Sequence, residues 1–171
     1  DLGSTILAAC GMKQLKEMTG VSFLRQLLGG QAEGRQYVCS ERGWHWGPIT
    51  RTDGLDLSRS ITTKRYRYIY NALPNRSYTP VDMSGKDAWK AIQSAHAAGR
   101  LSPLHERLFF QNPRPIVELY DLRNDPLELK NLAGEKSVTV TERALREQLE
   151  SWMIREHDYL PLPTHALQNT K

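Results

Sequence analysis

The sequence predicts an α+β fold in which a small antiparallel sheet carries a long C-terminal helix packed on one face. Between residues 139 and 157, apolar side chains recur at about 3.6-residue spacing, which is typical of a helix packed on a sheet. Residues 36–40, 60–71 and 117–122 are strand candidates, and aromatic and β-branched residues of the kind found there favour strands. No internal repeat is visible, so we expect one small sheet.

The remaining elements are predicted from local signals. Three segments have a glycine at or directly after their end, which suits a helix end, and are expected to be helical: 2–12, 23–28 and 87–98. Three further segments contain clustered Gly, Pro, Asn or Asp residues and are expected to be irregular or extended: 42–56, 73–82 and 101–115. Residues 160–171 contain proline without periodicity and are expected to form a tail.

A turn and a helix start are predicted directly after the strand at 117–122. The residues Asn124, Asp125 and Pro126 suit a turn, and Pro126 fixes φ for a first helical position. Asp125 as N-cap, with Glu128 three residues later, forms a capping box. The pattern therefore predicts a short helix that begins at Pro126.

Length and composition indicate a globular domain and not a membrane-spanning protein. A chain of 171 residues can bury roughly 70% of its unfolded surface. With 39% hydrophobic and 25% charged residues, it has the composition of a globular domain. No apolar run approaches the ~20 residues of a membrane span, so no membrane partner is expected. Cys10 and Cys39 are expected to be two buried thiols, and two positions alone do not indicate a disulfide.

Basic and aromatic residues alternate between positions 63 and 70, which suggests single-stranded nucleic acid as one alternative ligand. On a strand, however, alternate side chains point to opposite faces. One face would carry Lys64, Tyr66, Tyr68 and Tyr70, and the other Thr63, Arg65, Arg67 and Ile69. This division is ordinary strand chemistry, and we predict no nucleic-acid partner.

The run from Glu118 to Ala133 has the pattern E-L-Y-D-L-x-x-D-P-x-E-x-x-N-L-A. It closely resembles the signature near the C-terminus of type I sulfatases, members of the alkaline phosphatase superfamily that cleave sulfate esters or sulfamates. Four other segments are similar to sulfatase segments, although Ser4 stands where the family usually has proline: 1–11, 20–24, 37–45 and 59–71. Their order and spacing most resemble the heparan N-sulfatase (sulfamidase) branch.

The resemblance implies a domain organisation for the chain. Residues 1–30 would be a helical segment from the edge of an N-terminal catalytic domain, which is the expected partner. Residues 31–160 would be the C-terminal subdomain of the sulfatase fold, and residues 161–171 an irregular tail. The family implies a periplasmic, secreted or lysosomal location.

The resemblance also implies where the chemistry lies. Type I sulfatases carry a nucleophile motif C/S-x-P-x-R, whose Cys or Ser becomes formylglycine, and acidic residues that hold calcium. Neither Cys10 nor Cys39 has the proline and arginine of that motif. Calcium and formylglycine are therefore expected only in an intact enzyme, and the isolated chain is expected to be inactive. No catalytic or metal-ligating residue is assigned to this chain.

We therefore expect a C-terminal sulfatase fragment that shapes the pocket of an enzyme acting on sulfated glycans. By the resemblance, Glu41, Arg42 and His45 are the candidates for substrate recognition. Arginine and protonated imidazole donate charge-assisted hydrogen bonds to sulfate, and a carboxylate accepts them from sugar hydroxyls. The alternative for Glu41 and Arg42 is an ordinary surface ion pair.

Basic residues at the pocket rim would attract a polyanionic substrate. Arg42, Arg51 and Arg59 are the candidates for this role. His96, on a helical stripe, is expected to be a structural residue. Two alternative functions stay open, namely a phosphonate or phosphodiester hydrolase fragment of the same superfamily and a non-catalytic binding module.

Overall fold

The computed structural model of the chain describes residues 1–31, 34–44, 55–78 and 80–163. The chain divides into two compact units, Asp1–Gln36 and Tyr37–Lys171. No helix in these described ranges combines the length and the apolar character that a membrane crossing requires.

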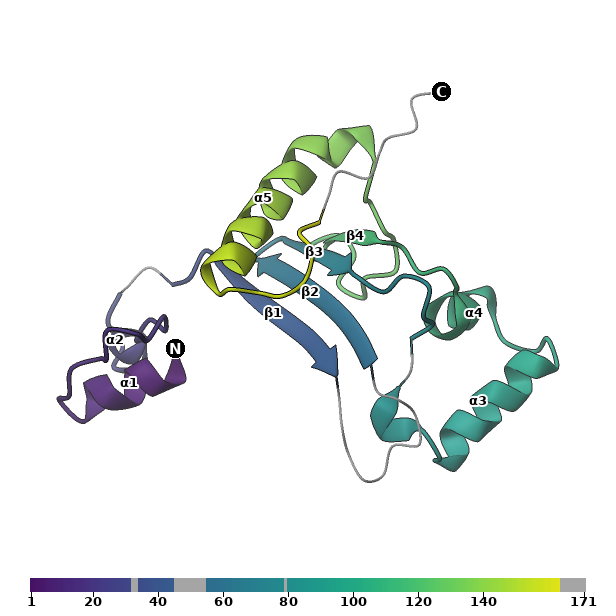
Figure 1. Cartoon of the computed structure of the whole chain (residues 1–171), viewed down its shortest axis with the longest axis horizontal. Coiled ribbons are helices and arrows are strands. Elements are labelled where there is room, and N and C mark those ends of the chain that lie inside the picture. Colours follow the sequence, from purple (N-terminus) through teal and green to yellow (C-terminus); the bar gives the residue numbers. More distant parts are fainter. Residues whose placement is uncertain (32–33, 45–54, 79, 164–171) are drawn as a thin grey trace. The chain divides into compact units, whose positions relative to one another are not determined.

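The second unit is built on a four-stranded antiparallel sheet with the order β1-β2-β3-β4. Helix α5 (Thr139–Arg155) lies across one face of this sheet (Figure 1). This arrangement confirms the predicted α+β fold. The strands are β1 (Tyr37–Trp44), β2 (Leu55–Thr63), β3 (Tyr66–Asn71) and β4 (Val117–Asp121).

The single strand predicted over residues 60–71 is wrong, because the chain reverses between Thr63 and Tyr66 and forms the β2–β3 hairpin. The Thr63 hydroxyl accepts hydrogen bonds from the N–H groups of Arg65 (3.3 Å) and Tyr66 (2.9 Å), which hold the turn. No glycine or asparagine marks this turn, so the sequence reads as one continuous strand. Likewise, β1 and β2 extend into the segment 42–56, which was predicted to be a loop.

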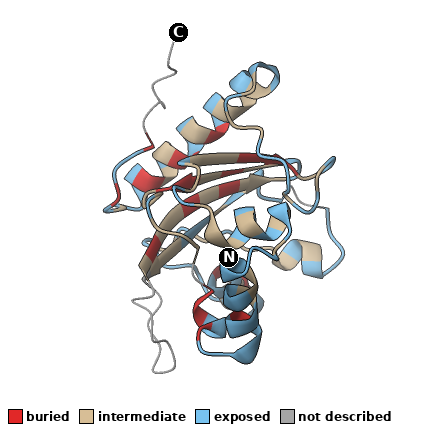
Figure 2. Cartoon of the chain, turned by 90° about the vertical axis from the view of Figure 1, so that its right-hand side faces the viewer, coloured by how far each residue is buried: buried red, intermediate tan, exposed pale blue. Residues whose placement is uncertain are grey.

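The core lies between α5 and the sheet face that α5 covers (Figure 2). Ile61, Tyr68 and Leu119 are cross-strand neighbours on this face, and each is at most 1% exposed. Leu149 and Met153 of α5 pack against them and are equally buried. Full burial of an apolar side chain of this size contributes roughly 1.5–3 kcal/mol. Apolar burial between helix and sheet therefore holds the unit together.

The β3 strand follows the predicted alternation of faces. Tyr66, Tyr68 and Tyr70 all lie against the core. Lys64, predicted to share their face, lies instead in the hairpin turn between β2 and β3. The aromatic side chains of this strand are therefore used for packing.

A long excursion between β3 and β4 contains the short helix η1 (Val81–Met83) and the helices α3 (Asp87–Ala97) and α4 (Pro103–Phe110). Helix α3 confirms a prediction, whereas α4 lies in the segment 101–115 that was predicted to be extended. Ser102 caps α4, since its hydroxyl accepts from the His105 N–H (3.3 Å) and Pro103 follows at the first helical position.

Aromatic stacking joins α3 to α4. Trp89 stacks on Phe110 with ring centroids 5.7 Å apart, and His96 stacks on the same ring at 3.8 Å. The His96 Nδ1 lies 2.8 Å from the carboxylate of Glu106. His96 is therefore a structural residue, as predicted.

The helix predicted to begin at Pro126 is absent, and a turn follows β4 instead. The Asp125 carboxylate accepts from the N–H of Lys130 (2.8 Å), five residues on. Glu128 has a left-handed backbone (φ 55°), and its carboxylate binds Arg67 of β3 at 2.5 Å. Because the Glu128 side chain is bound to the sheet in this ion pair, it does not cap a helix as the predicted capping box requires. The short helix η2 (Lys136–Val138) comes only later, directly before α5.

The first unit contains α1 (Leu2–Ala9) and α2 (Leu24–Leu27), both predicted, although α1 is shorter than the predicted 2–12. The Thr5 hydroxyl accepts from the Phe23 N–H (3.1 Å), which fixes α2 to α1. A Cβ at Gly20 would lie 2.7 Å from the Ser4 hydroxyl, so only glycine fits there.

Cys10 and Cys39 are both reduced and form no disulfide with each other. Cys10 is exposed, so its predicted burial is wrong, because it follows the last turn of α1 instead of facing the unit's interior. Cys39 is half-buried beside the core.

Candidate functional site

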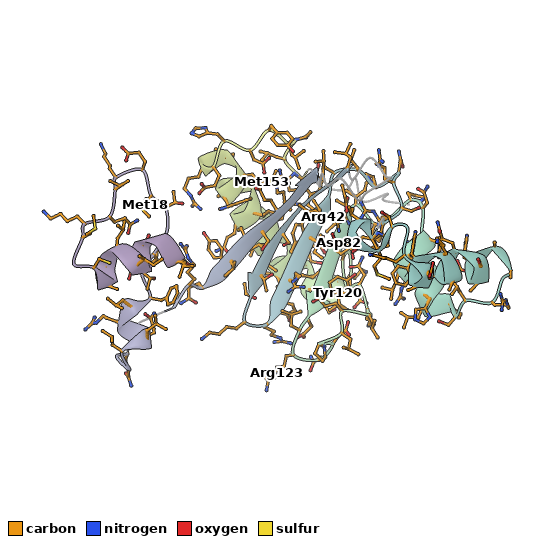
Figure 3. The ribbon with its side chains drawn as sticks, turned by 90° about the horizontal axis from the view of Figure 1, so that it is seen from below. Met18, Arg42, Asp82, Tyr120, Arg123 and Met153 are labelled. Atoms are coloured by element: carbon orange, nitrogen blue, oxygen red, sulfur yellow. The ribbon has the colours of Figure 1, made fainter. Side chains whose placement is uncertain are left out.

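A cavity of about 420 Å³ opens at the end of β1; we call it the first cavity. Glu41, Arg42 and Gly43 line one side, and Tyr78 with residues 80–83 line the other. Figure 3 shows Arg42 and Asp82 close together at this end of the sheet. Two of the three predicted recognition residues thus line one cavity. The third, His45, lies outside the described residues.

The side chains of Arg42 and Glu41 lie on opposite faces of the sheet, because successive side chains of a strand point to alternate faces. The Arg42 Nε lies 3.4 Å from the Asp56 carboxylate, and its guanidinium lies 5.0 Å from the centre of the Tyr78 ring. Glu41 is 68% exposed and lies 3.8 Å from Arg59. Arg42 therefore pairs with Asp56 on one face, and Glu41 pairs with Arg59 on the other.

Arg59 is buried, so the prediction that it lies at the pocket rim is wrong. Only 2% of its side chain is exposed, and it binds the Asp158 carboxylate through two hydrogen bonds (2.5 and 3.0 Å). It also donates to the backbone carbonyl of Arg42 (3.0 Å). Arg59 therefore fixes the strand that carries the first cavity to the segment that follows α5. The other predicted rim residue, Arg51, lies outside the described residues.

The pKa values of this pair follow from its geometry. Burial lowers the pKa of Arg59, but hydrogen bonds to Asp158 and Tyr159 outweigh it and hold the pKa above its usual value. The hydrogen bond from Arg59 in turn lowers the pKa of Asp158. Both groups are therefore charged at neutral pH.

The sheet face opposite α5 carries a network of charged side chains. Asp56, which is 8% exposed, binds both Arg42 and Arg114, the latter at 2.6 Å. Within the described residues, the Nε of Arg114 is buried and has no hydrogen-bond partner. No sequence pattern indicates this network, because Asp56 and Arg114 are 58 residues apart in segments predicted to be irregular or extended.

A second cavity, of about 220 Å³, adjoins this network. Arg107, Arg114, Glu118 and Tyr120 line it, and so does Tyr78, which also lines the first cavity. The two cavities therefore share one aromatic wall. They also share the Asp56 carboxylate as the partner of one arginine from each.

The wall of the second cavity is a set of hydrogen-bonded polar groups. The Glu118 carboxylate accepts from the Asn71 amide (2.6 Å) and from the Tyr120 hydroxyl. Burial raises the pKa of Tyr120, and the hydrogen bond to Glu118 acts in the same direction. Tyr120 is therefore a neutral donor at physiological pH, and Glu118 is held in one position.

Calcium and formylglycine, which the resemblance implies for an intact enzyme, do not fit the described residues. Those residues contain no group of three or more His, Cys, Asp or Glu side chains that could hold a metal ion. Cys10 and Cys39 lack the neighbours of a nucleophile motif. The two cavities instead offer guanidinium groups, the carboxylates of Glu41, Asp82 and Glu118, and phenol rings, which is the chemistry of binding a polar ligand.

Both the sequence and the fold of this chain are similar to parts of known proteins. No protein-family model matches the chain. An ulvan-active sulfatase from Formosa agariphila is 30% identical over 172 residues, which cover 99% of this chain and 27% of that protein. The fold is similar to that of a 2-O GAG sulfatase, with a TM-score of 0.58 and 21% identity over 92% of this chain and 25% of the other.

A second solved structure, in complex with its substrate D-glucosamine-2-N,6-O-disulfate, has a TM-score of 0.55. It is 16% identical over 93% of this chain and 24% of that protein. The chain thus spans about a quarter of the length of the proteins it matches. The sequence of this chain is thus similar to part of an ulvan-active sulfatase, and its fold is similar to part of two solved sulfatase structures.

Proposed function

We propose that the chain is the C-terminal part of a sulfatase that hydrolyses sulfated glycans, and that it forms one wall of the substrate pocket. The observation that carries this proposal is the first cavity, which brings Glu41 and Arg42 together with Tyr78. The similarity to an ulvan-active sulfatase over 99% of the chain supports the enzyme class. The nucleophile and the metal ligands belong, in this proposal, to the rest of the enzyme.

The proposed roles follow from the chemistry of the side chains. Arg42 can donate a bidentate pair of hydrogen bonds to a sulfate group, because a guanidinium presents N–H donors in a planar fork. Its position is fixed by the Asp56 carboxylate and the Tyr78 ring. Glu41, which is largely exposed, can accept from a sugar hydroxyl. His45 is proposed as a third recognition residue on the resemblance of its segment alone.

We further propose that the enzyme belongs to the sulfamidase branch and accepts N-linked as well as O-linked sulfate. The order and spacing of the family-like segments support this choice. One structural relative was solved with a substrate that carries both an N-sulfate and an O-sulfate. Incubating the full-length protein with D-glucosamine-2-N,6-O-disulfate, followed by mass spectrometry and an amine assay, separates the two reactions. Release of O-sulfate alone would contradict the N-sulfate proposal.

The pocket role is tested with Arg42→Ala in the full-length protein that contains this chain. We expect kcat/KM for sulfate release from ulvan oligosaccharides to fall roughly tenfold to hundredfold, as a lost charge-assisted hydrogen bond predicts. The fold should persist, because Asp56 keeps its ion pair with Arg114. Arg42→Lys keeps the charge but not the fork, and should recover only part of the loss.

The matched control is Arg123→Ala, an exposed arginine at the opposite end of the sheet (Figure 3). This variant should release sulfate like the wild type. Equal kcat/KM values for Arg42→Ala and Arg123→Ala would remove Arg42 from the pocket. A wild-type protein that releases no sulfate from ulvan or from glycosaminoglycans would contradict the proposed enzyme class.

A further inference from the structure

We propose that the second cavity is a subsite for the neighbouring sugar of the same glycan, and that it binds a negatively charged group on that sugar. This inference rests on the proposed function of the first cavity. It extends that function from one sulfated ring to two adjacent units of a polyanion.

The two cavities are adjacent parts of one surface. Tyr78 lines both of them. Asp56 binds Arg42 of the first cavity and Arg114 of the second. A ligand that fills the first cavity and continues past Tyr78 therefore enters the second. Such an arrangement suits a chain molecule with a repeating unit.

The charge of the second cavity favours an anionic group. Arg107 and Arg114 both line it, against one carboxylate, Glu118. Arg114 is already paired with Asp56, and its Nε is buried without a partner among the described residues, so Arg107 is the lining arginine that can bind a further anionic group. Arg107 donates one N–H to the Leu129 carbonyl (2.7 Å), and a guanidinium carries five. A carboxylate or a sulfate matches such donors.

The polar wall of the cavity suits the hydroxyl groups of a sugar. Glu118 accepts from Asn71 and Tyr120, and a carboxylate has about four lone-pair positions, so it can accept further hydrogen bonds. The volume of about 220 Å³ lies below the roughly 300–1,000 Å³ of pockets for drug-sized ligands. The cavity therefore suits a small unit such as one sugar ring.

The experiment is a double-mutant cycle between Arg107 and the charge on the sugar, measured in the full-length protein by titration calorimetry. The probes are ulvan oligosaccharides, the same oligosaccharides after carbodiimide–borohydride reduction of their carboxylates, and the same after solvolytic desulfation. Arg107 is exposed, so Arg107→Ala should fold normally. Arg123→Ala, which lies outside both cavities, is the matched control.

We expect Arg107→Ala to raise the Kd of the intact oligosaccharide roughly tenfold to hundredfold. We also expect one chemical treatment to weaken binding by the wild type more than binding by Arg107→Ala, because in the variant the partner of the removed group is already gone. Desulfation also removes the sulfate that Arg42 binds, so it weakens both proteins, and the coupling is the difference between the two losses. The treatment that shows this coupling identifies the bound group as a carboxylate or a sulfate. Arg123→Ala should behave as the wild type with every probe.

Additive effects of Arg107→Ala and both treatments would overturn the inference, and so would Kd values equal to those of Arg123→Ala. A second variant, Leu108→Trp, places a large ring at a half-exposed position that lines the cavity. It should also weaken binding, and unchanged binding would count against the subsite. Sulfate release by the wild type is assayed separately, so failure of the subsite and failure of the proposed function give different results.

Discussion

The burial of Arg59 in β2 and its ion-pair partner could not be predicted from the sequence. Arg59 was expected at a pocket rim, because arginine is common on surfaces that bind anions. Its actual partner, Asp158, is 99 residues away, and no local pattern connects them. The candidate residues Glu41 and Arg42 came instead from the resemblance of their own segment, and both line the first cavity. The Asp56–Arg114 pair had no such local signal.

The pair of Arg59 and Asp158 gives a prediction at the residue scale. Arg59→Ala should lower the free energy of unfolding by about 3–5 kcal/mol, because it leaves a buried carboxylate without its partner. Urea denaturation followed by circular dichroism measures this change.

The control for that prediction is Arg143→Ala, which breaks an exposed ion pair with Glu147 within α5. Such a pair contributes only about 0.3–0.5 kcal/mol. A loss at Arg59 as small as the loss at Arg143 would show that the buried pair does not stabilise the fold.

At the scale of elements, the long periodic pattern of α5 gave an accurate prediction, whereas some short local patterns were misinterpreted. Helix α5 repeats its apolar face over 17 residues, and its position was predicted to within two residues. By contrast, α4 was predicted to be extended because its segment contains three prolines. Pro103 is in fact the first helical residue after the Ser102 cap. A proline breaks a helix in its interior but suits its start, and composition alone does not separate these cases.

The cap of α4 gives the prediction at this scale. Ser102→Ala should destabilise the protein by about 0.5–2 kcal/mol, because the His105 N–H loses its acceptor. Differential scanning calorimetry should detect the change as a lower Tm. Ser94→Ala, in the exposed middle of α3, removes a hydroxyl of the same kind without removing a cap. It should leave Tm unchanged or raise it slightly, since alanine favours helix interiors.

At the scale of the whole molecule, the chain consists of two units with separate sets of internal contacts. All residues of the hydrophobic core belong to the unit that begins at Tyr37. The overall α+β arrangement was predictable because it depends on the summed pattern of strands and one long helix. The pairing of distant charges on the sheet face opposite α5 could not be predicted, because it depends on the register of four strands.

This division predicts that the second unit folds without the first. Deletion of residues 1–36 should shift the Tm of the sheet unit by no more than about 4 °C, since no core contact is lost. Thermal unfolding by circular dichroism checks this. Leu149→Ala in the same shortened chain should cost about 2–5 kcal/mol, because that side chain is fully buried. Loss of a cooperative transition on deletion alone would contradict the independence of the two units.

The excursion between β3 and β4 has a consequence for how relatives of this chain diversify. Its two ends meet at the sheet, where the Asn71 N–H donates to the Ile116 carbonyl at 2.8 Å. It supplies Tyr78, Arg107 and Arg114 to the cavities, whereas the core residues of the sheet and α5 come from outside it. Lengthening such a loop costs little, about 0.6 kcal/mol per doubling. Insertions or substitutions in this excursion can therefore change the residues that line both cavities while the core between the sheet and α5 stays intact.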